Sequence, residues 1–570
     1  MKWLLRPSSL IFVSMALALG AATLALWPRI PANRALPLAV DRDDREIVWL
    51  YAATNSAPWE RFVSAIRVAR DRLEKESGAL GFEIDDCNAF PEQTTTVPEV
   101  ALAMRGVKGR LWLRWYKLTS DLKTRDWVAA LLQRRPPPLA IIGGSTSDLA
   151  IDLARTLKVE ATKQRLGADS PLLLLTTATA DAAGLERGQG EPPPLTSLYP
   201  GLTYRFCFTN RQMAEAVTSF IWSQLDLRPD ADPFYVTFWQ DDPYSTDLNQ
   251  RFCDALRAPA YHAAARDWAW QAGAAALGNV PLDLGILWGT KFRLPTPYES
   301  GGVLYSVGDF SRPNRWEVKA ATEMMETMDR YPQQRRPLLV VPAQTQPARR
   351  FLRALVREAP VQARRFVVAT GDAIAFNTIY RDRNIAWQIQ DLPFTLVLFC
   401  HRNPIDPGAG FPLEAAMQHP ESGEAAETAA GTEDLLLFVD MIHVLAQGCA
   451  RNDATGGGNL PPNAAALGQR LKQVHWSEQS DGICSKADGQ LLFDENGNRR
   501  SSTGEHVVLL RPSVRGRKVL PEAQIEVCTW QVQEDTGKHA WRRPDRPLVV
   551  RYEGYMEQET GENANADNRR

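Results

Sequence analysis

Apolar and polar residues alternate along the chain in a pattern that predicts strands followed by helices. An apolar run from Glu46 to Ala53 predicts a strand, and apolar residues on one stripe between Trp59 and Lys75 predict a helix. Further strands are expected at 81–84, 111–115, 139–142, 171–175, 233–239, 337–342, 365–369 and 394–400, and further helices at 125–133, 212–224, 348–357 and from 432. Strands that alternate with helices favour a parallel sheet, so the expected fold class is α/β.

Two successive strands of this pattern end in hydroxyl-bearing residues. The strand at 139–142 is followed by Gly-Gly-Ser-Thr-Ser, and the strand at 171–175 by Thr-Thr-Ala-Thr. Ligands of parallel sheets bind beyond the carboxyl ends of the strands, where helix N-terminal amides also suit an anionic group. The candidate ligand-binding residues are therefore Ser145, Thr146, Ser147, Thr176, Thr177, Ala178 and Thr179. The alternative is that Ser147 or Asp148 only caps a helix.

The order of four short motifs resembles a known family. Gly144 to Ser147 is followed by Ala178-Thr179, then by Tyr204-Arg205, and then by Asp241 to Tyr244. This order is similar to the leucine/isoleucine/valine-binding branch of the type I periplasmic binding proteins, a family that also supplies receptor ligand-binding regions. The likeness spans about residues 46 to 450. It implies two Rossmann-like lobes with parallel sheets joined by a hinge, and capture of a solute between them.

The resemblance also implies contacts from the second lobe. Tyr244 and Asp372 are expected to close on the ligand, while Arg205 is expected to be a structural strut. Two departures from the family pattern stand out: Tyr244 is followed by Ser245 instead of glycine, and Asp372 lies one position earlier than the family's glutamate. The implied ligand is a small polar molecule, such as an amino acid, an amide or a related carboxylate.

The N-terminus indicates export. Lys2 and Arg6 precede the uncharged run from Leu10 to Trp27, whose length is marginal for a membrane span. An uncleaved anchor and a cleaved signal peptide both remain open, and either places the bulk of the chain outside the cytoplasm, in the periplasm or the extracellular space.

The expected domain organisation follows from these features. The segments are a membrane anchor or signal at 1–28, a linker at 29–45, two lobes at 46–450, a β-rich extension at 451–555 and a disordered tail at 556–570. The first lobe is expected at about 46–210 and 431–450, and the second at about 211–405. The extension is expected either as a small β appendage or as strands that complete the lobes.

Composition excludes several classes of function. The chain has 65 basic and 67 acidic residues, so no overall field recruits nucleic acid. Its seven cysteines show no spacing typical of a metal site, and no cofactor or metal is expected. The expected partners are a small polar solute, an ABC permease or an envelope protein, and the membrane through the N-terminal segment.

Two other functions compete with solute binding. The first is a membrane-anchored interaction protein that has lost its ligand and binds an envelope partner. The second is a serine hydrolase built from Ser147 and a distant histidine, although the chain lacks Gly-x-Ser-x-Gly, HExxH and P-loop motifs. His401 is expected to be a hydrogen-bonded loop residue and His443 a packed one. We expect no enzymatic activity.

Overall fold

A computed structural model of the chain describes most of the residues between 35 and 551. The described residues are 35–52, 54, 56–76, 81–183, 193–229, 234–239, 242–257, 302–306, 316–332, 334–374, 393–403, 432–450, 458–473, 476–477, 490–491, 493–500, 505–515, 518–532, 539–544 and 546–551. The apolar run at 10–27 and the tail at 556–570 lie outside them. Among the described helices, none combines the length and apolar character needed to cross a membrane. The six described cysteines are free thiols.

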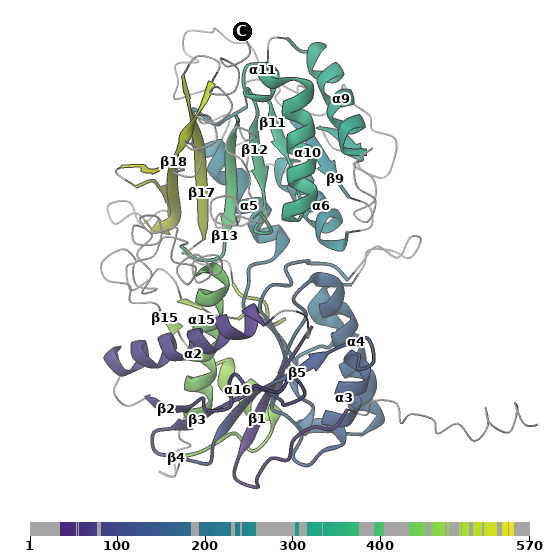
Figure 1. Cartoon of the computed structure of the whole chain (residues 1–570), viewed down its shortest axis with the longest axis vertical. Helices are drawn as coiled ribbons and strands as arrows, with labels where there is room; N and C mark the ends of the chain where they lie inside the picture. Colours follow the sequence, from purple (N-terminus) through teal and green to yellow (C-terminus); the bar gives the residue numbers. More distant parts are fainter. Residues whose placement is uncertain are drawn as a thin grey trace, which may run out of the picture.

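The first lobe contains a mixed sheet with helices on both faces (Figure 1). Its strand order is β2-β3-β5-β1-β6-β7-β8, and the strands from β5 to β8 run parallel while β2 and β3 are antiparallel. The strands are β1 (Arg45–Ala52), β2 (Phe82–Asp85), β3 (Glu99–Met104), β5 (Leu111–Leu118), β6 (Ala140–Ile142), β7 (Leu172–Leu175) and β8 (Thr203–Arg205). All four leucines of β7 are buried, as expected for a parallel strand covered on both faces.

Helices from distant parts of the chain cover this sheet. One face is packed by α2 (Ala57–Glu76), α15 (Thr432–Ala450) and α16 (Ala464–Leu471), and the other by α3 (Thr124–Gln133) and α4 (Ser147–Lys163). A short strand, β14 (Gly458–Asn459), also pairs with β4 (Val107–Lys108) of this lobe. The first lobe therefore includes residues 458–471 as well as the N-terminal part of the chain.

The second lobe has a sheet of nine strands. Its order is β10-β9-β11-β12-β13-β17-β18-β19, with β20 paired to β18. The first five strands are parallel: β9 (Phe234–Phe238), β10 (Gly302–Ser306), β11 (Leu338–Val340), β12 (Val367–Thr370) and β13 (Thr395–Cys400). The others are antiparallel: β17 (His506–Arg515), β18 (Lys518–Val532), β19 (His539–Arg542) and β20 (Leu548–Arg551). The C-terminal strands thus extend the second sheet by pairing with β13.

Two pairs of helices cover the second sheet. On one face lie α9 (Trp316–Asp329) and α10 (Thr345–Glu358), and on the other α5 (Asn210–Ser223) and α6 (Pro243–Arg257). The short helix α11 (Pro360–Ala363) follows α10. The predicted α/β class with parallel sheets is confirmed, and antiparallel strands are added at the edges of both sheets.

The order of the described elements takes the chain from one lobe to the other three times. It crosses from β8 to α5, from β13 to α15, and from the turn at 493–500 to β17. This turn lies on the edge of the first sheet, because Arg205 N–H donates to Gly497 O at 2.8 Å and Arg499 N–H donates to Arg205 O at 3.1 Å. Since β8 and β13 both lead into crossings, the carboxyl ends of both parallel sheets face the boundary between the lobes.

A buried ion-pair network fixes the start of the described chain to the opposite end of the first lobe. The Glu46 carboxylate pairs with Arg114 at 3.1 Å, accepts a hydrogen bond from the Tyr116 hydroxyl at 3.0 Å, and also pairs with Arg134. Leu38 N–H donates to Tyr116 Oη at 3.1 Å. Part of the segment expected to be a linker therefore lies against the first lobe.

Candidate functional site

The two hydroxyl loops lie side by side at the carboxyl edge of the first sheet. Gly144 allows the first loop to turn, because its φ is +69° and an added Cβ would lie 2.6 Å from Ala150 Cα. The Thr177 hydroxyl donates to Ser145 O at 2.9 Å, and Ala180 N–H donates to Ser147 Oγ at 3.2 Å. Two of the predicted ligand hydroxyls thus hold the loops to each other.

The other predicted residues of these loops differ in exposure. Thr146 and Ser145 are half-buried, and the Thr146 hydroxyl bonds to Asp148. Ala178 and Thr179 are buried, with 0% and 1% of their surface exposed. Ser147 starts α4, with Thr146 at the N-cap position.

Tyr244, Asp372 and His401 form a hydrogen-bonded cluster in the second lobe. The Tyr244 hydroxyl donates to Asp372 Oδ1 at 2.9 Å, and His401 Nε2 lies 2.9 Å from Asp372 Oδ2. Phe208 N–H donates to His401 Nδ1 at 3.1 Å, which leaves the proton of a neutral ring on Nε2, facing the carboxylate. Burial, and then the charge of Asp372, raise the pKa of Tyr244 well above its ordinary value. Both predicted second-lobe residues are therefore together and bonded to each other.

A second polar cluster joins the lobes directly. Asp181, in the loop after β7, accepts a hydrogen bond from Arg211 N–H at 2.7 Å and lies 3.5 Å from Arg251 Nε of α6. Asp181 N–H in turn donates to Asp247 Oδ2 at 2.8 Å. Burial, and then the charge of Asp181, raise the pKa of Asp247. This cluster holds the first lobe against α5 and α6.

A third cluster lies where the crossings meet. Asp440 of α15 is 3.6 Å from Arg402 Nε and 3.9 Å from Arg499 Nη1, and all three side chains are buried. The Arg499 guanidinium also lies over the Phe208 ring, 4.3 Å from its centroid. These contacts tie the second and third crossings to the first.

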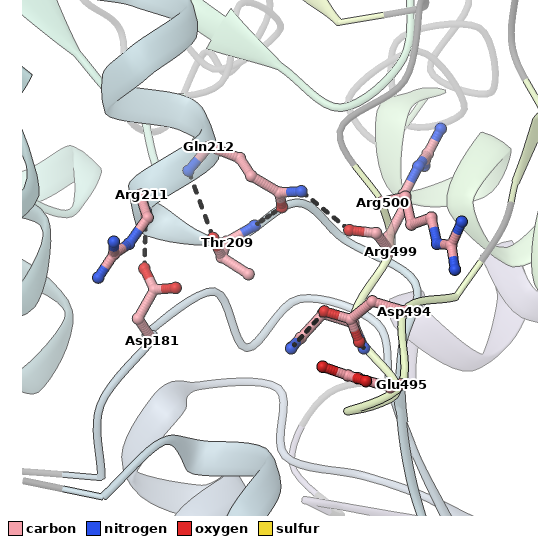
Figure 2. Close-up of a pocket in the computed structure, with 9 residues that line it drawn as sticks. Asp181, Thr209, Arg211, Gln212, Asp494, Glu495, Arg499 and Arg500 are labelled. Atoms are coloured by element: carbon pink, nitrogen blue, oxygen red, sulfur yellow. Dashed lines mark hydrogen bonds between the residues drawn. The ribbon is translucent and has the colours of Figure 1, made fainter.

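A pocket of about 570 Å³ opens beside the crossings (Figure 2). Its walls are the loop after β7, the N-terminus of α5 and the turn at 493–500. The lining residues are Asp181, Thr209, Arg211, Gln212, Asp494, Glu495, Asn498, Arg499 and Arg500. Gln212 Nε2 donates to Arg499 O at 2.9 Å, which links two of these walls. None of the residues predicted from the sequence to bind a ligand lines this pocket.

The structure brings the predicted residues together in two groups. The hydroxyl loops form one and Tyr244 with Asp372 the other, and among the described residues no hydrogen bond or ion pair joins the groups. The sequence reasoning did not find Asp181, Asp247 or Arg251. The position of Asp181 immediately after the second hydroxyl run was an available signal.

The histidines of the hydrolase alternative are engaged elsewhere. His401 contacts Asp372 and Phe208 as described, and His443 is buried on α15 with Nε2 3.1 Å from Ala69 O. Within the described chain, the Ser147 hydroxyl bonds to Ala180 N–H and to no histidine.

Comparison with known proteins found similar solved structures only. No family model and no curated protein matches the chain. An ABC transporter substrate-binding protein from Desulfitobacterium hafniense aligns at 12% identity with a TM-score of 0.45, covering 88% of this chain and 100% of that chain. A solute-binding protein of an ABC transporter from R. palustris, in complex with 4-hydroxybenzoate, aligns at 10% identity with a TM-score of 0.44. The alignment covers 90% of this chain and 100% of that chain.

A third solved structure extends this set. The type 1 periplasmic binding protein from Bordetella pertussis Tohama I aligns at 10% identity with a TM-score of 0.44, covering 84% of this chain and 99% of that chain. With TM-scores below 0.5, the fold assignment rests on the strand order and the three crossings described above.

Proposed function

We propose that the chain is an extracytoplasmic solute-binding protein that captures a small polar molecule at the boundary between its lobes. The observation that carries this proposal is the meeting of two parallel sheets, carboxyl edge to carboxyl edge, across three crossings. Polar side chains of both lobes gather at that boundary, and a pocket of about 570 Å³ opens there. Ligands of open α/β sheets bind in this position, and two lobes joined at a hinge can close on them.

The ligand contacts we propose are the hydroxyl loops at 145–147 and 177–179 with Tyr244 and Asp372. Ser145 and Thr146 are the half-buried residues of the first loop, whereas Ser147 is buried. Asp372 presents a carboxylate held by Tyr244 and His401, which favours a hydroxylated or cationic part of the ligand. The leucine/isoleucine/valine branch, and with it an amino-acid ligand, belongs to this proposal. So does delivery to an ABC permease.

The test is thermal unfolding of a protein beginning at Ala35, which keeps the segment bonded to Tyr116 and Arg114. The panel contains amino acids, amides, small carboxylates and sugars. A ligand at about 100 times its dissociation constant stabilises the folded form by about 2.7 kcal/mol, which shifts the unfolding midpoint visibly. Asp372→Asn should weaken binding of the hit about tenfold. The exposed Asp152→Asn on α4 is its matched control. Equal affinity in both variants would remove Asp372 from the site.

One observation favours a second function, an interaction protein without a ligand. Several of the predicted contact groups are already bonded within the protein: Thr177 to Ser145, Ser147 to Ala180, and Tyr244 to Asp372. A cleft whose polar groups satisfy one another needs no solute. An unfolding midpoint that no compound of the panel shifts, together with binding of an envelope protein to the folded chain, would favour this function over solute capture.

A further inference from the structure

The imidazole ring of His401 joins the first crossing to the carboxyl edge of the second sheet. His401 directly follows β13, where the second crossing begins, and Phe208 belongs to the first crossing, between β8 and α5. Phe208 N–H donates to His401 Nδ1 at 3.1 Å, and His401 Nε2 lies 2.9 Å from Asp372 Oδ2. One side chain therefore contacts both a backbone amide of a crossing and a proposed ligand contact.

Aromatic packing holds this ring in place. It stacks on the Phe208 ring, with centroids 5.9 Å apart and an interplanar angle of 7°, and the Phe399 ring meets it edge-on at 5.3 Å. Both phenylalanines are fully buried, and His401 is 2% exposed. Side chains packed this closely leave the ring little freedom to turn, so its two nitrogens keep facing Phe208 and Asp372.

The Asp372 carboxylate has room for a further contact. Its side chain is 14% exposed, and its Oδ1 accepts a hydrogen bond from the Tyr244 hydroxyl at 2.9 Å. Because burial and then the charge of Asp372 raise the pKa of Tyr244, that hydroxyl keeps its proton and remains a donor. A carboxylate offers about four acceptor sites, and the bonds to Tyr244 and His401 use two of them.

We propose that His401 is a positioning residue of the solute site, which fixes the Asp372 carboxylate and transmits a change at that carboxylate to the first crossing. The inference rests on the proposed function and adds a residue to its site, where the ligand contacts Asp372 and not His401. It gives His401 a role beyond that of the hydrogen-bonded loop residue that the sequence predicts.

The tautomer of the ring carries the change. A neutral imidazole has one N–H and one acceptor nitrogen. The carboxylate of Asp372 only accepts, so it holds the proton on Nε2 and leaves Nδ1 to accept from Phe208 N–H. A ligand group that engages the carboxylate weakens this preference, and the Phe208 amide then loses its acceptor for part of the time. The first crossing becomes easier to bend, which couples solute binding to the movement of the lobes.

The experiment uses the empty protein and compares two buried carboxylates of the boundary. Asp372→Asn replaces the carboxylate beside His401 by an amide of the same shape, which donates as well as accepts. Asp247→Asn is the matched control, because Asp247 bonds to Asn210 and to Asp181 N–H instead. Asp372→Glu, which keeps a carboxylate, tests for rescue.

Two measurements are made at about pH 8, where histidine rings are normally neutral. Nitrogen NMR of histidine-labelled protein reports which ring nitrogen of His401 carries the proton. The chain has seven histidines, and His401→Gln identifies the resonances of this ring by their loss. Hydrogen exchange of the Phe208 amide, followed in phenylalanine-labelled protein, reports whether its acceptor is kept.

In the parent we expect a protonated Nε2, an unprotonated Nδ1 and a slowly exchanging Phe208 amide. Asp372→Asn should populate the second tautomer and speed the exchange of that amide about tenfold, because the amide loses its acceptor. Asp247→Asn should leave the tautomer unchanged and the exchange rate within about twofold. Asp372→Glu should restore the tautomer of the parent. Asp372→Ala replaces the Asn variant if that variant does not fold, with the same two expectations.

Three results would overturn the inference. The first is a parent ring with both nitrogens protonated, because Phe208 N–H cannot donate to a protonated Nδ1. The second is an unchanged tautomer or an unchanged Phe208 amide in Asp372→Asn. The third is an equally faster exchange in Asp247→Asn, which would show that a looser boundary is sufficient.

The panel of compounds separates this failure from a failure of the proposed function. A hit in the panel, with unchanged exchange of the Phe208 amide in Asp372→Asn, would leave solute binding standing and overturn the role of His401. Faster exchange in Asp372→Asn, with no hit in the panel, would support the link between Asp372 and the first crossing and overturn the solute site.

Discussion

The ion pairs at the two ends of the first lobe differ in length. At the end away from the second lobe, Arg114 lies 3.1 Å from Glu46 and 2.8 Å from Glu99. At the boundary, Arg251 lies 3.5 Å from Asp181 and 3.4 Å from Asp247, and the Asp440 pairs are longer still, at 3.6 and 3.9 Å. Thr179, Arg205 and Asn210, each with a side-chain atom that has no hydrogen-bond partner among the described residues, also lie at this end.

This difference indicates which contacts stabilise the fold and which contacts can break when the lobes move. The attraction within a short ion pair offsets more of the desolvation cost of its two charges than the attraction within a long pair does. The outer network should therefore dominate the free energy of unfolding. The boundary network should instead govern how closely the lobes approach each other.

The largest effect is expected from Glu46→Gln. The substitution leaves Arg134 with a neutral amide in place of its carboxylate partner and Arg114 with Glu99 alone, which should lower the free energy of unfolding by about 3 kcal/mol. Urea unfolding measures this loss. The surface pair of Arg67 and Asp86 supplies the control, since Asp86→Asn should cost about 0–1 kcal/mol. Equal losses in the two variants would show that the outer network is not dominant.

The next effect concerns the third crossing, through Gly497→Ala. Gly497 has a φ of +81°, and an added Cβ would lie 1.9 Å from Thr203 O, so the turn would have to leave the edge of β8. We expect a loss of about 3 kcal/mol, from conformational strain and overpacking together. Gly201 has a φ of +73° with no atom within 4 Å of its added Cβ. Gly201→Ala should therefore lose only about 1–2 kcal/mol of the free energy of unfolding. Urea unfolding measures both losses. A similar loss in both would mean that the contact with Thr203 is dispensable.

Arg251→Met tests the boundary cluster and should act more on shape than on stability. Its ion pairs are long, so the free energy of unfolding should fall by only about 1–2 kcal/mol. Without the guanidinium, Asp181 and Asp247 repel each other across the boundary, and the lobes should move apart. Small-angle scattering would record a larger radius of gyration. A loss as large as that of Glu46→Gln with an unchanged radius would contradict the distinction between the two networks.

The smallest effect is a pH dependence. The pKa of Asp247 is raised by burial and then by the charge of Asp181. The folded protein therefore holds this proton at pH values where the unfolded chain, with a pKa of about 4, has lost it. The contribution of Asp247 is most favourable at low pH, and it declines as the pH rises above about 4. The parent should lose stability relative to Asp247→Asn over that rise, as measured by unfolding at a series of pH values. A constant difference between the two would rule out the coupling.

Most of the strand and helix alternation could be predicted from the sequence because the apolar periodicity is strong. The predicted strand from Glu46 to Ala53 corresponds to β1, and the predicted helix from Trp59 to Lys75 to α2. The strand β3 was missed, since Glu99–Met104 is short and contains two alanines. The pairing of β17 with β13 was left open because periodicity identifies strands but not their partners.

The site was less accessible to sequence reasoning. The loops at 145–147 and 177–179 lie side by side because both follow neighbouring parallel strands, which is a local consequence of the fold. Asp181, Asn210 and Asn498 meet only through the crossings, and their positions in the chain give no indication of that. Whether any of these residues binds a ligand stays a prediction until binding is measured.

The pairing of the C-terminal strands with β13 has a consequence for the order in which the protein matures. The second sheet lacks four of its strands until residues 506–551 are synthesised, and the first lobe lacks α15 and α16 until residues 432–471 are synthesised. Neither lobe is therefore complete while the chain is still emerging, and the apolar edge of β13 stays uncovered during that time. A chain that crosses a membrane as it is made would need protection from aggregation until its last strands arrive.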